Sequence, residues 1–126
     1  MKYLLDTHVL LWYLRNSAEL SDSARETIDH AQSVFVSIAS LWEIAIKQSI
    51  GKLKLEVSTP RLEQLCSERD IRMIGIRTAE IERVKTLPDI HRDPFDRLLV
   101  AQAQEGGLVI VTRDRMIPQY PVQTIW

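Results

Sequence analysis

Short apolar runs alternate with longer segments of helical character along this chain, and that alternation restricts the folds it can adopt. Strands are predicted at residues 3–5, 34–37, 73–76 and 108–112, with a weaker fifth candidate at 122–125. The runs do not alternate clearly between polar and apolar residues, which is typical of strands covered on both faces. The segments between them predict helices at 7–14, 21–31, 39–50, 59–69, 78–86 and 93–105. This order predicts a three-layer α/β/α domain with a mainly parallel sheet of four to five strands.

The helix predicted at 93–105 has clear signals at both ends. Asp93 directly precedes Pro94, a pair that favours a helix start, with Asp93 as the N-cap. Gly106 and Gly107 follow the last helical residue and suit a left-handed C-terminal cap. A length of 126 residues without repeats or linker-like stretches predicts a single domain over residues 1–126.

Charge and cysteine content exclude several classes of protein. The formal net charge is −1, so the chain is not a strongly basic nucleic-acid binder, although clustered acids that hold cations would hide a basic surface in this sum. Cys66 is the only cysteine, which excludes an intrachain disulfide and a Cys-rich zinc site. No apolar run is long enough to span a membrane. We therefore expect a cytoplasmic protein without a membrane partner.

Two aspartates end predicted strands. Asp6 ends YLLD and Asp114 follows VIVTR, and parallel strands bring such side chains to the same edge of a sheet, where α/β proteins bind ligands. Each has a simpler interpretation. Asp6 is a candidate N-cap for the next helix, and Asp114 is a candidate turn residue.

Two further acids lie on helical stripes that include apolar residues. At 100° per residue, Asp96 falls near Ala103 and Leu99, and Glu43 shares a stripe with Ile46. A surface ion pair with Lys47 is the simpler interpretation of Glu43. The sequence shows no matching set of inward bases, and clustered carboxylates repel one another unless a cation lies among them. Oxygen ligands suit Mg²⁺ or Mn²⁺, and one or two such ions at an acidic cluster are typical of enzymes that hydrolyse phosphodiesters.

Four stretches resemble one known family. LLDTHVLLW, SIASLWEIAIK, HRDPFDRLLVAQA and VIVTRD, in this order and near these spacings, resemble the PIN-domain ribonucleases, and among them the VapC-like toxins of type II toxin–antitoxin pairs. The resemblance implies strand order 3-2-1-4-5 and a divalent-metal-dependent endoribonuclease that leaves a 5′-phosphate. It implies a cognate antitoxin and a homodimer as partners. The family's catalytic and metal-binding acids match Asp6, Glu43, Asp96 and Asp114, with Thr112 in a supporting position.

From the resemblance we expect Asp6, Glu43 and Asp96 to hold the principal ion and Asp114 to support it or a second one. Asp93 has a supporting role at the same helix start. Either Glu43 or Asp114 positions the attacking water. Four arginines that flank the motifs are candidates for RNA phosphate contacts, although each also fits an ordinary surface charge. They are Arg92, Arg97, Arg113 and Arg115.

Other functions remain open from the residues alone. A magnesium-dependent phosphatase or a receiver-like protein also places an aspartate after its first strand, but a dehalogenase-type phosphatase needs a second aspartate where this chain has His8. A non-catalytic binding module would have no need for all four acids. His8 and His91 lie beside motif acids, where a hydrogen-bonded loop or cap role is the simpler interpretation.

Overall fold

A five-stranded parallel sheet forms the centre of the computed structural model, which describes residues 1–126. Its order, β3-β2-β1-β4-β5, confirms the predicted fold class and the strand order implied by the resemblance. All four pairings are parallel, and β1 is the central strand, hydrogen-bonded to β2 on one side and β4 on the other. The strands are β1 (Lys2–Leu5), β2 (Ser33–Ser37), β3 (Ile71–Ile74), β4 (Val109–Val111) and β5 (Thr124–Ile125).

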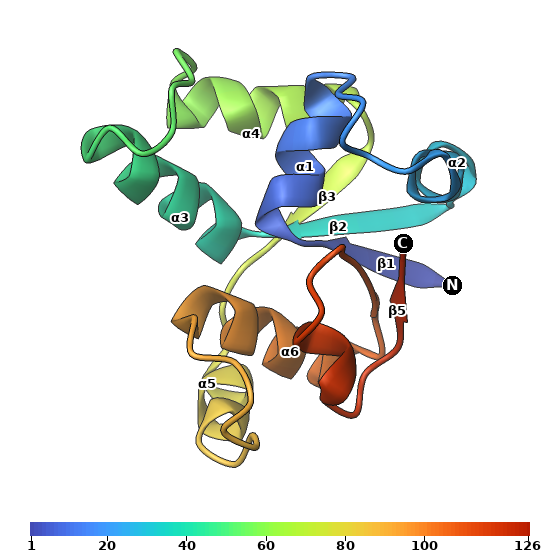
Figure 1. Ribbon diagram of the computed structural model, residues 1–126, viewed down its shortest axis with the longest axis vertical. Coiled ribbons are helices and arrows are strands. Elements are labelled where there is room, and N and C mark those ends of the chain that lie inside the picture. Colours follow the sequence, from blue (N-terminus) through green and yellow to red (C-terminus); the bar gives the residue numbers. More distant parts are fainter.

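Helices cover both faces of this sheet, as Figure 1 shows. Four of them lie on one side and two on the other, so the chain forms three layers. The helices are α1 (Thr7–Leu14), α2 (Asp22–His30), α3 (Ile38–Ser49) and α4 (Thr59–Glu68) on the first side, and α5 (Thr78–Val84) and α6 (Pro94–Gly106) on the second, with a short 3-10 helix, η1 (Ile117–Gln119), near the C-terminus. No helix is long and apolar enough to cross a membrane.

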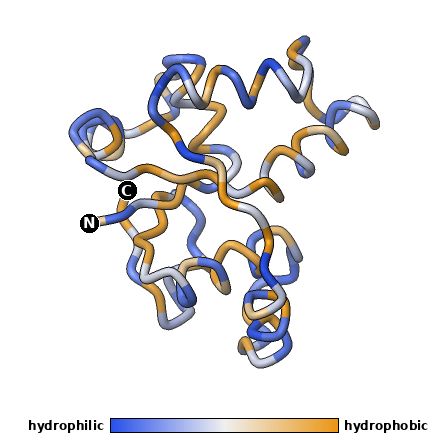
Figure 2. The backbone as a smooth tube through the Cα atoms, turned by 180° about the vertical axis from the view of Figure 1, so that it is seen from behind, coloured by the Kyte–Doolittle hydropathy of each residue, from blue (hydrophilic) through white to orange (hydrophobic).

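The two faces of the sheet bury separate apolar clusters. The larger cluster has 16 buried residues and packs α1, α2, α3 and α4 against Leu5, Val36 and Val111. The smaller has 10 and packs α6 and η1 against Leu4 and Ile110. Neighbouring residues of one strand face opposite clusters, because side chains alternate along a strand. Figure 2 shows the resulting hydrophobic centre between more hydrophilic outer segments.

The elements begin and end within two residues of their predicted bounds, and the largest displacement is that of β3, which lies two residues earlier than predicted at both ends. Val34 of β2 pairs with Ile71, and Ser37 pairs with Ile74, after which the chain leaves the sheet at Gly75. Ile76, predicted to end the strand, is partly exposed beyond it. The predicted caps of α6 are both present. Asp93 is its N-cap, and Gly107 adopts the left-handed conformation (φ 63°) and donates its N–H to Ala103 O.

Candidate metal centre

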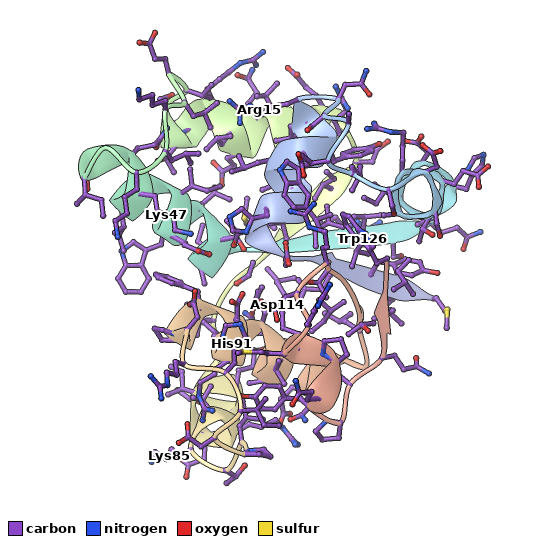
Figure 3. The ribbon with its side chains drawn as sticks, viewed as in Figure 1. Arg15, Lys47, Lys85, His91, Asp114 and Trp126 are labelled. Atoms are coloured by element: carbon purple, nitrogen blue, oxygen red, sulfur yellow. The ribbon has the colours of Figure 1, made fainter.

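A cavity of about 380 Å³ lies at the carboxyl ends of β1 and β4. All four predicted acids, Asp6, Glu43, Asp96 and Asp114, line it, although they come from four different segments of the chain. α3 and α6 approach this edge from opposite faces of the sheet (Figure 1). Figure 3 shows His91 and Asp114 close together beside α6.

Asp6 is both an N-cap and a cavity residue, so the two interpretations of the sequence are compatible. Its Oδ1 accepts the N–H of Val9 in the first turn of α1, at 2.9 Å. Its Oδ2 accepts the hydroxyl of Thr112, which follows β4. The side chain is only 6% exposed. Burial raises the pKa of Asp6, and the hydrogen bonds from Thr112 and Val9 oppose that rise without cancelling it.

Glu43 is buried in α3 at 4% exposure and carries the ion pair that the spacing suggested. Its Oε1 accepts the hydroxyl of Thr7 at 2.6 Å, and its Oε2 contacts Lys47 Nζ at 2.7 Å. The ion pair with Lys47, given as the simpler interpretation of Glu43, is therefore present, although Glu43 is buried and lines the cavity. Burial lowers the pKa of Lys47, but the hydrogen bond and charge of Glu43 outweigh it, so the pKa is raised and Lys47 stays charged.

Asp93 and Asp96 have different roles at the start of α6. Asp93 Oδ1 accepts the N–H groups of Phe95 at 2.8 Å and of Asp96 at 3.4 Å, as expected of an N-cap. The side chain of Asp96 points into the cavity and is 18% exposed. Burial, followed by the charge of Asp93, raises the pKa of Asp96 to about 7, while His91 acts in the opposite direction.

Asp114 is held by the turn that follows β4. Its Oδ1 accepts the N–H groups of Met116 and Ile117 at 2.7 and 3.1 Å, and its own N–H donates to Thr112 Oγ1 at 3.0 Å. Burial acts to raise the pKa of Asp114. Hydrogen bonds from His91 and from these two backbone groups outweigh burial, and the pKa is lowered. Asp114 therefore has the predicted turn role through Oδ1, while its Oδ2 lies at the cavity beside His91.

His91 bridges the two half-buried acids from a loop, which agrees with the hydrogen-bonded role that was its simpler interpretation, although the sequence did not identify these partners. Its Nε2 lies 3.0 Å from Asp96 Oδ2 and 3.0 Å from Asp114 Oδ2. Its Nδ1 accepts the N–H of Asp93 at 3.1 Å, so the proton of a neutral ring is on Nε2 and points at the carboxylates. The HRD triplet placed His91 beside a motif aspartate in the sequence. His91 lies in a loop, however, and hydrophobic periodicity does not predict where a loop side chain points.

The donor set fits a divalent cation. Carboxylate oxygens of Asp96 and Asp114 lie within 4.8 Å of each other, and Asp6 and Glu43 line the same cavity. Carboxylate oxygens are the ligands that Mg²⁺ and Mn²⁺ favour. Burial raises the pKa values of Asp6 and Asp96. The raised pKa values show that the charged carboxylates are disfavoured where they lie, because hydrogen bonds do not fully replace the water that they have lost. A cation bound among them would remove this penalty.

The four arginines do not share one role. Arg97 is bound to neighbouring backbone groups. Its guanidinium donates to the carbonyls of Val84 and Pro88 at 3.1 and 2.9 Å and to the hydroxyl of Tyr120 at 3.2 Å, so it ties the end of α5 to α6 and does not line the cavity. Arg113 lines the cavity. Arg92 and Arg115 are exposed, Arg92 in a shallow depression beside Lys47.

The chain is similar to several known proteins in sequence and in fold. The family model of the PIN domain matches residues 3–123. Ribonuclease VapC22 of Mycobacterium tuberculosis is 32% identical over 98% of this chain and 97% of its own. A chain of the VapBC2 complex of Rickettsia felis, bound to a DNA fragment from its promoter, superposes with a TM-score of 0.70 at 13% identity, covering 99% of this chain and 98% of that one. A chain of a toxin–antitoxin complex from Klebsiella pneumoniae gives a TM-score of 0.68 at 20% identity, with 99% and 97% covered.

Proposed function

Because this chain belongs to the PIN-domain family, we propose that it is a metal-dependent endoribonuclease and the toxin of a toxin–antitoxin pair. The observation that carries the proposal is the convergence of Asp6, Glu43, Asp96 and Asp114 on one cavity at the carboxyl edge of the sheet. Residues 1–126 form one nuclease domain in this proposal. RNA as the substrate makes the cytoplasm the place of action.

The four acids would hold one or two Mg²⁺ or Mn²⁺ ions. When bound, such an ion lowers the pKa of water and neutralises negative charge on the phosphate of the substrate. Thr112 holds Asp6 by its hydroxyl and receives the N–H of Asp114, so one side chain fixes the relative position of two of the acids. Thr7 and Lys47 fix the two oxygens of Glu43 in the same way. These contacts pre-organise the carboxylates, which reduces the cost of arranging them around a charged substrate.

His91 and Arg113 contribute positive or hydrogen-bonding groups at the same cavity. The N–H of His91 lies between Asp96 and Asp114 and can orient both carboxylates, since each keeps further lone pairs that could hold a cation. Arg113 carries the charge that attracts RNA phosphates to the mouth of the cavity.

A protein partner is supported by an exposed apolar stripe on α3. Ile38, Trp42, Ile46 and Ile50 recur every four residues, and Trp42 is 62% exposed with its ring against Phe95. An apolar stripe of this kind on a helix is typical of a protein interface. The stripe shares α3 with Glu43, so an antitoxin seated on it would also restrict access to the cavity. The family resemblance makes a homodimer the expected assembly of the toxin itself.

The test is hydrolysis of labelled substrates by the purified protein. Single-stranded RNA, DNA of the same sequence and a generic phosphomonoester are incubated with Mn²⁺ and with EDTA. Internal cleavage of RNA that EDTA abolishes supports the proposal. Asp6→Asn should reduce the rate by at least about a hundredfold, whereas Asp89→Asn, at an exposed loop residue, should leave it unchanged. Hydrolysis of the phosphomonoester alone, or RNA cleavage that persists in Asp6→Asn, would contradict it.

A further inference from the structure

The wall of the cavity continues into a cluster of rings and one guanidinium. His8 and Trp12, one turn apart on α1, stack with centroids 5.7 Å apart and planes at 30°. The guanidinium carbon of Arg113 lies 4.4 Å from the centroid of the Trp12 ring. Trp126 meets Trp12 edge to face at 5.8 Å. His8, Trp12 and Arg113 line the same cavity as the four acids.

This cluster is not explained by core packing alone. His8 and Arg113 are exposed, and Trp12 is half-buried, with its inner part against the larger apolar cluster. Metal chemistry at the acids does not use any of these side chains. The arrangement leaves an aromatic and cationic surface at the mouth of a cavity that is otherwise acidic.

Stacked rings and a guanidinium plane are the groups on which proteins stack unpaired nucleobases. Every base has a π face, whereas a paired base in a duplex is covered by its neighbours. The acids beside the cluster define where the scissile phosphate lies, so a base held here belongs to an adjoining nucleotide. We propose that His8, Trp12 and Arg113 form a base-stacking subsite that holds one unpaired nucleobase of single-stranded RNA next to the scissile phosphate; this inference rests on the proposed nuclease function.

Two contacts support this role for Arg113. It pairs with Glu19 at 2.8 Å, and both side chains are about half exposed, so the pair contributes little stability and an RNA phosphate can replace Glu19. Trp126 sits behind Trp12 as a support, since its ring meets Trp12 by an edge, and the guanidinium of Arg113 is also 6.0 Å from it. The guanidinium can therefore stay over the aromatic pair while its partner changes.

The experiment measures binding separately from cleavage. Affinity for a short labelled single-stranded RNA is measured by fluorescence anisotropy in EDTA, where metal-dependent hydrolysis is off. An otherwise identical RNA that lacks the base on one side or the other of the cleavage position is the second probe. The wild type should bind the complete RNA at least about tenfold more tightly than one of the abasic RNAs, as expected for loss of one stacked base.

The variants then identify the side chains. We expect each of three variants to bind the complete RNA more weakly and to show a smaller difference in affinity between complete and abasic RNA: His8→Ala, Trp12→Leu and Arg113→Ala. Trp12→Phe keeps an aromatic ring and should keep most of the affinity for the complete RNA. His30→Ala and Arg61→Ala are matched controls on the exposed surfaces of α2 and α4. Circular dichroism checks that Trp12→Leu is folded; if it is not, His8→Ala and Arg113→Ala carry the test.

The outcomes separate the two proposals. A wild type that cleaves RNA with Mn²⁺ but binds complete and abasic RNA equally would overturn the subsite and leave the nuclease function intact. Full retention of the preference for the complete RNA in His8→Ala and Arg113→Ala would also overturn the subsite and leave the nuclease function intact. A wild type that shows no metal-dependent cleavage overturns the nuclease function, and with it the subsite.

Discussion

Replacing Asp96 by asparagine should make the metal-free protein more stable while it abolishes metal-dependent cleavage. Burial and the charge of Asp93 raise the pKa of Asp96 from 3.8 to about 7. The native state therefore keeps a proton on this carboxyl that the unfolded chain has already lost. Stability falls as the pH rises from about 4 to about 7, because over this interval the native state binds more protons than the unfolded state. Above that interval the full penalty of the ionised carboxylate is present.

The size of the penalty follows from the shift. The rise in the pKa of Asp96 from 3.8 to about 7 corresponds to about 4 kcal/mol, which is a ceiling for a side chain that is 18% exposed. Relaxation and water entry around a charged group reduce it. We expect Asp96→Asn to gain about 2 kcal/mol in unfolding free energy at pH 8 in EDTA, which is roughly 5–10 °C in melting temperature for a domain of this size.

Thermal melts in EDTA between pH 4 and pH 9 measure this difference. The gain should be near zero at pH 4, grow towards pH 7 and then level off. Asp89→Asn, at an exposed loop position, is the control and should follow the wild type. A variant that is less stable than the wild type by 1 kcal/mol or more at pH 8, or a difference that does not change with pH, would refute the reasoning and assign Asp96 a structural role in α6.

Three further perturbations test other contacts. Saturating Mg²⁺ or Mn²⁺, at about 100 times its dissociation constant, should stabilise the wild type by about 2.7 kcal/mol and Asp96→Asn by far less; equal shifts in the two melting curves would place the ion elsewhere. Thr112→Val removes the hydroxyl that binds Asp6 and should cost about 1–3 kcal/mol in urea unfolding, together with most of the cleavage activity; wild-type activity would contradict a positioning role. Arg97→Ala should cost about 2 kcal/mol by releasing the end of α5, with RNA affinity unchanged at constant salt, and a clear loss of affinity would restore Arg97 as a phosphate contact.

The fold was predictable because its signals are local. The strand runs, the caps of α6 at Asp93 and Gly107 and the order of elements can all be read from neighbouring residues. The exception, β3, shows the limit. Its register is set by pairing with β2, from Ile71 to Ile74, and the apolar run in the sequence extends beyond the residues that find a partner.

The site was predictable only in part. Asp6 and Asp114 follow strands, and Asp96 shares a stripe with the buried Leu99, so topology brings these acids to one edge. The stripe argument was weaker for Glu43, because Ile46 is partly exposed and Glu43 is buried through its contacts with Thr7 and Lys47. His91 and Arg97 show what pattern cannot supply. The direction of His91 depends on a loop, and the guanidinium of Arg97 turns to carbonyls that are exposed only because α5 ends there. His91 depends on two carboxylates from other segments and Arg97 on carbonyls of an earlier helix end, and periodicity reports neither.

The central place of β1 in the sheet has a consequence for the newly made chain. β1 pairs with β4, and the hydroxyl of Thr112 reaches Asp6 across 106 positions of sequence. Contacts of such long range form late, because the entropy of closing the loop must be overcome before the contact contributes. A chain that ends before β4 has neither Thr112 nor Asp114, so it lacks one of the four acids and the hydroxyl that holds Asp6. The cavity of four acids is therefore completed only after β4 has paired with β1, which makes it one of the last parts of the fold to assemble.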